Sequence, residues 1–120
     1  MIFPAVYALV IGAAMIVQWS ISYFTHQIPE LTSEPIRIRF HLAGEFATAA
    51  ALIVSGAGLL ASSVWAAPLF LVAAGMLFYT AIVSPGYFAQ QGSWAWVGIF
   101  GVMIVAGVLA VLRVVSLTAG

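Results

Sequence analysis

The chain has 120 residues, of which 65% are hydrophobic and only 5% charged, with three basic and three acidic side chains. Because a soluble domain carries about 25% charged residues, this composition excludes an ordinary aqueous surface and predicts a protein that resides in a lipid bilayer. The zero net charge and the absence of lysine exclude a nucleic-acid-binding face, and the absence of cysteine excludes disulfides and Cys-ligated metals.

Four apolar runs follow one another along the chain, each close to the roughly 20 residues that a helix needs to cross a bilayer. They cover residues 2–24, 36–61, 65–83 and 93–117. The first run lacks a positive flank and is too long for a signal peptide, so we expect it to be retained. Together the runs predict an all-α fold, a single transmembrane domain over 1–120 that forms an integral membrane four-helix bundle with up-down-up-down topology.

Residues 25–35 form the most polar connection, with two prolines and two carboxylates. At its end, Ser33 is a suitable N-cap, Glu34 suits the positive end of a helix dipole, and Pro35 is tolerated in a first turn. An even number of crossings places both termini on the same side of the membrane. The positive-inside rule counts two arginines (Arg37 and Arg39) against one (Arg113), which favours the Arg37 side as cytoplasmic but leaves the orientation uncertain.

The second run carries a polar stripe at helical spacings of three, four or seven residues. Its members are Glu34, Arg37, His41, Glu45, Thr48 and Ser55. Beside it lies a ridge of small residues that favours close helix packing, formed by Gly44, Ala47, Ala51 and Gly58. An ionisable group at membrane depth costs about 2.5–3.5 kcal/mol, so Glu45 indicates a function by default. We therefore expect the stripe to face the interior of the bundle.

Polar side chains on the other runs gather at the same depth as the stripe, whereas the opposite half of the bundle is apolar. This pattern predicts a pocket that is open on one side, with an apolar floor and a few polar groups at its mouth. The predicted ligand-binding residues are Arg37, His41, Glu45, Thr48, Gln18, Tyr79, Trp94 and Trp96.

Several functions are consistent with this site. The leading one is binding of a lipophilic or amphipathic small molecule such as a lipid, quinone or isoprenoid. A membrane enzyme would use His41 and Glu45 as catalytic general acid and base on a lipophilic substrate. An accessory subunit would bind a partner membrane subunit through the stripe. Finally, Arg37, His41 and Glu45 can neutralise one another and serve only to fix the helix register.

The sequence names no cofactor. His41 and Glu45 offer two ligands on one helix where a stable metal site needs three or four, so we expect no metal site. A bis-histidine haem would require His26, which lies in the polar connection.

Small residues on the second and fourth runs, including Gly98, Gly101 and Gly107, offer surface for a homo-oligomer.

Overall fold

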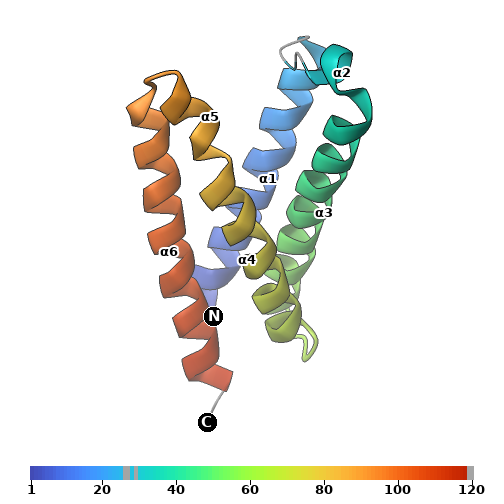
Figure 1. Ribbon diagram of the computed structural model, residues 1–120. Helices are drawn as coiled ribbons and strands as arrows, with labels where there is room; N and C mark the ends of the chain where they lie inside the picture. The colour runs from blue at the N-terminus through green and yellow to red at the C-terminus, as the bar shows by residue number, and fades with distance from the viewer. Residues whose placement is uncertain (26–27, 29, 119–120) are drawn as a thin grey trace.

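The computed structural model describes residues 1–25, 28 and 30–118, and these residues form helices and no strands (Figure 1). The helices are α1 (Ile2–Phe24), α2 (Glu30–Ser33), α3 (Pro35–Leu60), α4 (Ala66–Val83), α5 (Pro85–Gln90) and α6 (Trp94–Thr118). Four helical stretches are long and apolar enough to cross a membrane, the third being α4 continued through α5. The predicted all-helical fold is confirmed, and its four long apolar stretches suggest a small multi-pass membrane protein.

Proline sets the two helix starts nearest the polar end of the molecule. Glu34 is the N-cap of α3 and Pro35 its first residue, one position later than the sequence indicates. Proline suits this position because its missing N–H would have no helical partner there. Pro85 likewise begins α5 directly after α4, and it gives the carbonyl of Ala81 no helical donor. The polar connection contains the one-turn helix α2, and His26 lies outside the described residues.

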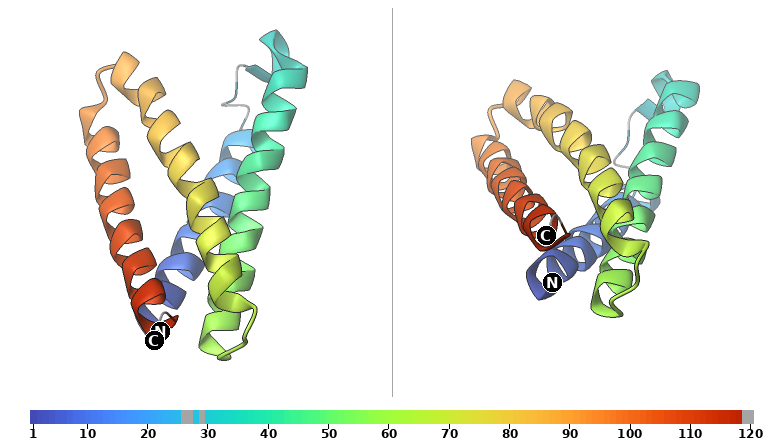
Figure 2. Two further views of the ribbon diagram at one scale, coloured as in Figure 1. Left: turned by 60° about the horizontal axis from the view of Figure 1, so that its bottom comes forward. Right: turned by 90° about the horizontal axis from the view of Figure 1, so that it is seen from below.

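The long helices contact one another in series. Helix α1 packs along α3, α3 packs against α4, and α4 packs less extensively beside α6. Figure 2 shows that α1 and α3 diverge from α4 and α6 towards the end that carries α2 and α5, and that the start of α1 lies beside the end of α6 at the opposite end. The molecule is elongated and flattened, with extents of 49 × 26 × 19 Å.

Two glycines allow α1 and α3 to approach each other closely. A methyl group on Gly12 would lie 2.9 Å from the carbonyl oxygen of Ala49, and one on Gly56 would lie 3.0 Å from the carbonyl oxygen of Ala5. The predicted ridge of small residues is not this contact, since it lies about half a turn away around α3 at roughly 100° per residue. Gly44, one of its members, faces open space.

The densest packing lies in the half of the molecule away from α2 and α5. Phe70, Leu52 and Val114 are fully buried there. The Tyr7 hydroxyl donates a hydrogen bond of 2.7 Å to the carbonyl oxygen of Met103, which ties α1 to α6. The sequence places almost nothing polar in this half, and Tyr7 corrects that expectation because an apolar helix can place one phenol against a neighbouring backbone.

Candidate functional site

The polar stripe on α3 divides into an exposed part and a buried part. The side chains of Arg37 and Glu34 are 81% and 49% exposed, and Arg37 Nη1 lies 3.2 Å from Glu34 Oε1. Glu45, in contrast, is only 5% exposed, and Thr48 is equally buried. The expectation that the whole stripe faces inward is therefore wrong for its first turns, where Ile38 is buried and Arg37 lies about 100° away from it around the helix. Arg37 pairs with Glu34 rather than with the buried carboxylate.

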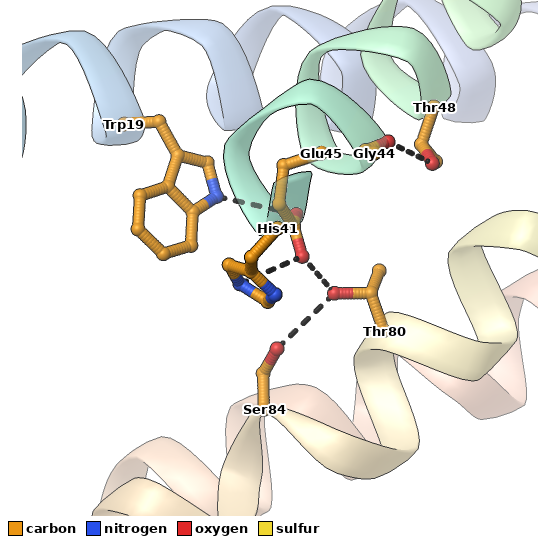
Figure 3. A network of polar contacts seen from close by, with 7 residues as sticks. All are labelled: Trp19, His41, Gly44, Glu45, Thr48, Thr80 and Ser84. Atoms are coloured by element: carbon orange, nitrogen blue, oxygen red, sulfur yellow. Dashed lines mark hydrogen bonds and ion pairs between the residues drawn. The ribbon is translucent and has the colours of Figure 1, made fainter. Parts of the chain in front are cut away.

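Glu45 joins three long helices through its carboxylate (Figure 3). The indole N–H of Trp19, on α1, donates to Oε2 at 3.2 Å. The hydroxyl of Thr80, on α4, donates to Oε1. Since hydrogen bonds to ionised groups are stronger than those between neutral groups, the two donors hold the carboxylate in place at the junction of α1, α3 and α4.

His41 lies beside this carboxylate and is open on one side. Its Nε2 is 3.5 Å from Glu45 Oε1, and its side chain is 42% exposed. The imidazole meets the indole of Trp19 edge-on, with the ring centroids 5.5 Å apart. One edge of the imidazole therefore contacts the buried network while the rest of the ring remains accessible.

A second hydroxyl extends the network along α4. Thr80 Oγ1 and Ser84 Oγ are 3.1 Å apart. Because the single hydroxyl hydrogen of Thr80 is donated to Glu45, the hydrogen between the two hydroxyls comes from Ser84. Thr48 does not join this network, since its hydroxyl donates to the carbonyl oxygen of Gly44 on its own helix at 2.8 Å.

The length of α3 indicates the depth of the site. With 26 residues, the helix is about 39 Å long, whereas the hydrocarbon core of a bilayer is about 30 Å thick. If Leu60 lies at one edge of the hydrocarbon, His41 lies close to the other edge. Glu45 is then about 6 Å deeper, at 1.5 Å per residue.

The remaining predicted ligand-binding residues lie away from this network. Gln18 is exposed, as are Tyr79, Trp94 and Trp96 at 74%, 66% and 52%. Trp96 instead stacks on Phe88 of α5, with ring centroids 5.5 Å apart.

The network uses Trp19, Thr80 and Ser84, which the predicted set does not contain. Trp19 and Thr80 directly follow Gln18 and Tyr79 in the sequence, so each lies on the same helical turn as a residue of the predicted set. One signal for Trp19 was available, since the indole N–H of a buried tryptophan requires an acceptor.

Two hollows are formed elsewhere by the described residues. A shallow groove of about 540 Å³ runs along α6, lined by Gly98, Gly101, Val102, Val105, Ala106 and Leu109. A smaller hollow of about 270 Å³ lies near the turn between α3 and α4. Neither of these two hollows is lined by His41 or Glu45.

The comparisons place the chain in one family. A family model described as "Domain of unknown function (DUF8058)" matches residues 2–119. No curated protein and no solved structure matches the chain.

Proposed function

The chain belongs to the DUF8058 family, and we propose that it is an integral membrane protein that binds an amphipathic molecule from the bilayer, with the polar head of that molecule at His41 and Glu45. The observation that carries the proposal is the contact between a buried carboxylate and a partly exposed imidazole, with Nε2 and Oε1 3.5 Å apart. The buried carboxylate of Glu45 can hydrogen-bond to a polar head, and the exposed edge of the His41 imidazole lets that head reach the site from the bilayer.

The proposal includes a placement in the membrane. The four long helical stretches cross it in alternating directions, with both termini on one side and the α2 and α5 end on the other. We orient the end with Arg37 and Arg39 towards the cytoplasm, which the count of two arginines against one favours. In this placement His41 lies at the boundary between headgroups and hydrocarbon, which is the depth of the polar head of a lipid, quinone or isoprenoid.

The energetic argument starts from Glu45. A carboxylate at membrane depth costs about 2.5–3.5 kcal/mol, and a group retained at that cost generally has a function. Arg37 does not offset the cost because it pairs with Glu34. The open edge of His41, whose side chain is 42% exposed, gives a bilayer molecule access to the site.

The test is the identity of the molecules that co-purify with the protein. The wild type, His41→Ala and Arg39→Gln are purified in the same mild detergent, and retained lipids are quantified by mass spectrometry. Arg39 is exposed on the same helix and serves as the matched control. We expect one amphipathic species to fall by about tenfold in His41→Ala, the change that 1.4 kcal/mol produces, and to persist in Arg39→Gln. The same lipid profile in all three proteins would contradict the proposal.

The geometry of His41 and Glu45 favours a second candidate, a membrane enzyme. A carboxylate that contacts an imidazole can orient it as a general base, as in many hydrolytic and transfer enzymes. Here the substrate would be a bilayer molecule, and His41→Ala would abolish its conversion while wild-type protein consumes it.

The exposed face of α6 favours a third candidate, an accessory subunit or a homo-oligomer in which another apolar helix covers the groove at Gly98 and Gly101. A stable complex in mild detergent, lost in Gly101→Leu, supports this role. A detergent-corrected monomer with no partner removes it.

A further inference from the structure

The charge of Glu45 has no arginine to balance it. Among the described residues, His41 is the one basic side chain within ion-pair distance of its carboxylate. Arg37 is paired with Glu34, and both Arg39 and Arg113 are exposed. His41 contacts one side of the carboxylate, and the side towards α4 faces hydroxyl groups and no positively charged side chain among the described residues.

Two hydroxyl oxygens of α4 extend from the carboxylate of Glu45. Thr80 Oγ1 contacts Glu45 Oε1, and Ser84 Oγ lies 3.1 Å from Thr80 Oγ1. Figure 3 shows these three oxygens as a bent chain that runs from Glu45 to Thr80 and on to Ser84. Each has lone pairs that can bind a cation. Across the part of the chain that the structure describes, no three His, Cys, Asp or Glu side chains come together, so the available donors suit a hard cation that takes oxygen ligands.

Pro85, the first residue of α5, leaves a backbone carbonyl next to Thr80 in the sequence without its usual helical donor. Ala81 follows Thr80 directly and is 1% exposed. Its carbonyl would accept a helical hydrogen bond from residue 85, which is a proline without an N–H. In membrane transporters, carbonyl oxygens released at interrupted helices coordinate sodium ions.

We propose that Glu45, Thr80 and Ser84 form a binding site for one sodium ion, with the carbonyl of Ala81 as a further ligand. A monovalent cation neutralises the single carboxylate, whereas a divalent cation would leave a net positive charge in apolar surroundings. With sodium bound, His41 is free to serve the amphipathic ligand. The site goes beyond the proposed function and does not rest on it, because it uses the α4 side of Glu45.

The experiment measures thermal unfolding of the full chain in detergent at fixed pH, as NaCl replaces choline chloride at constant ionic strength. Ligand binding to the folded state raises the unfolding temperature with ligand concentration. We expect a rise of several degrees that saturates with sodium. We expect Thr80→Val and Ser84→Ala to abolish it and Thr80→Ser, which retains the hydroxyl, to preserve it. Calorimetric titration of folded Ser84→Ala with NaCl gives an independent reading, and we expect no binding heat.

Two results would overturn the proposal. The first is equal stability in sodium and choline, including stability that changes with pH alone, since a proton then balances Glu45. The second is a sodium response that survives both Thr80→Val and Ser84→Ala. Lipid retention that depends on His41 is a separate measurement, so either proposal can fail while the other stands.

Discussion

Replacing Glu45 with glutamine removes the buried charge and keeps the shape of the side chain. In the folded protein, the amide oxygen can still accept the indole N–H of Trp19. The amide nitrogen then donates to Thr80 Oγ1, and the hydroxyl of Thr80 turns its hydrogen towards Ser84, 3.1 Å away. Every polar group of the network therefore retains a partner, so we expect Glu45→Gln to fold.

The expected change in unfolding free energy is small. Each retained hydrogen bond loses its charge-assisted part, about 1 kcal/mol, and removal of a carboxylate from apolar surroundings offsets this loss. We expect a net change within about 1 kcal/mol of the wild type in sodium-free buffer. If Glu45 served mainly in a structural ion pair, its removal would cost about 3–5 kcal/mol. Arg37 is not stranded by the change, because its carboxylate partner is Glu34.

Reversible unfolding in detergent, followed by the near-ultraviolet signal of the tryptophans, measures this difference. Glu34→Gln is the matched control, since it removes an exposed carboxylate and we expect a loss of about 0–1 kcal/mol. Glu45→Leu is the contrasting variant, because it leaves the N–H of Trp19 unpaired at a cost of about 1–3 kcal/mol. A loss of 3 kcal/mol or more in Glu45→Gln would refute the reasoning and assign the network a structural role.

Three further predictions concern packing and topology. Gly12→Ala should destabilise the α1–α3 contact by about 1–3 kcal/mol, because the new methyl group lies 2.9 Å from a backbone oxygen. Gly44→Ala, whose methyl group meets nothing within 4 Å, should be neutral or slightly stabilising in the same thermal unfolding experiment. Tyr7→Phe removes the hydrogen bond to Met103 and should lower the free energy of unfolding by about 0.6 kcal/mol, and by no more than about 1.7 kcal/mol. An unchanged unfolding temperature would show that this hydrogen bond contributes nothing. Cysteine labelling in intact cells should find Thr32→Cys and Gln91→Cys on one side of the membrane and Ser63→Cys on the other. Any other pattern excludes four crossings.

Sequence patterns predict the helices of this chain because the signal for a long apolar helix is its length and composition. The four runs and their breakers at Pro35 and Pro85 are visible without a structure. The short helices α2 and α5 are less visible, since a single turn has no periodicity to detect.

The rotation of each helix about its axis is harder to predict, and the details of the site depend on it. Gln18 and Trp19 differ by about 100° around α1, and polarity favours Gln18 as the inward residue. The structure turns Trp19 inward, because the close approach at Gly12 determines which face of α1 meets α3. When most faces of a helix are apolar, its sequence does not reveal which of them is buried.

The charged end of α3 shows a second limit. Helical spacing places Arg37, His41 and Glu45 on one face, but spacing does not show how much of that face the neighbouring segments cover. Arg37 is 81% exposed although the next residue, Ile38, is buried. Arg37 therefore pairs with Glu34 at the surface, and the contacts of Glu45 are with Trp19, Thr80 and His41. The sequence identifies the two central residues, and contacts between helices identify their partners.

An experimental structure of the protein in lipid nanodiscs, prepared without delipidation, tests the central claim most directly. The account predicts density for an elongated molecule along the helices, with its polar end within hydrogen-bond distance of His41 and absent from His41→Ala. An imidazole covered only by the protein's own side chains, or by lipid no better ordered than elsewhere around the chain, would contradict it.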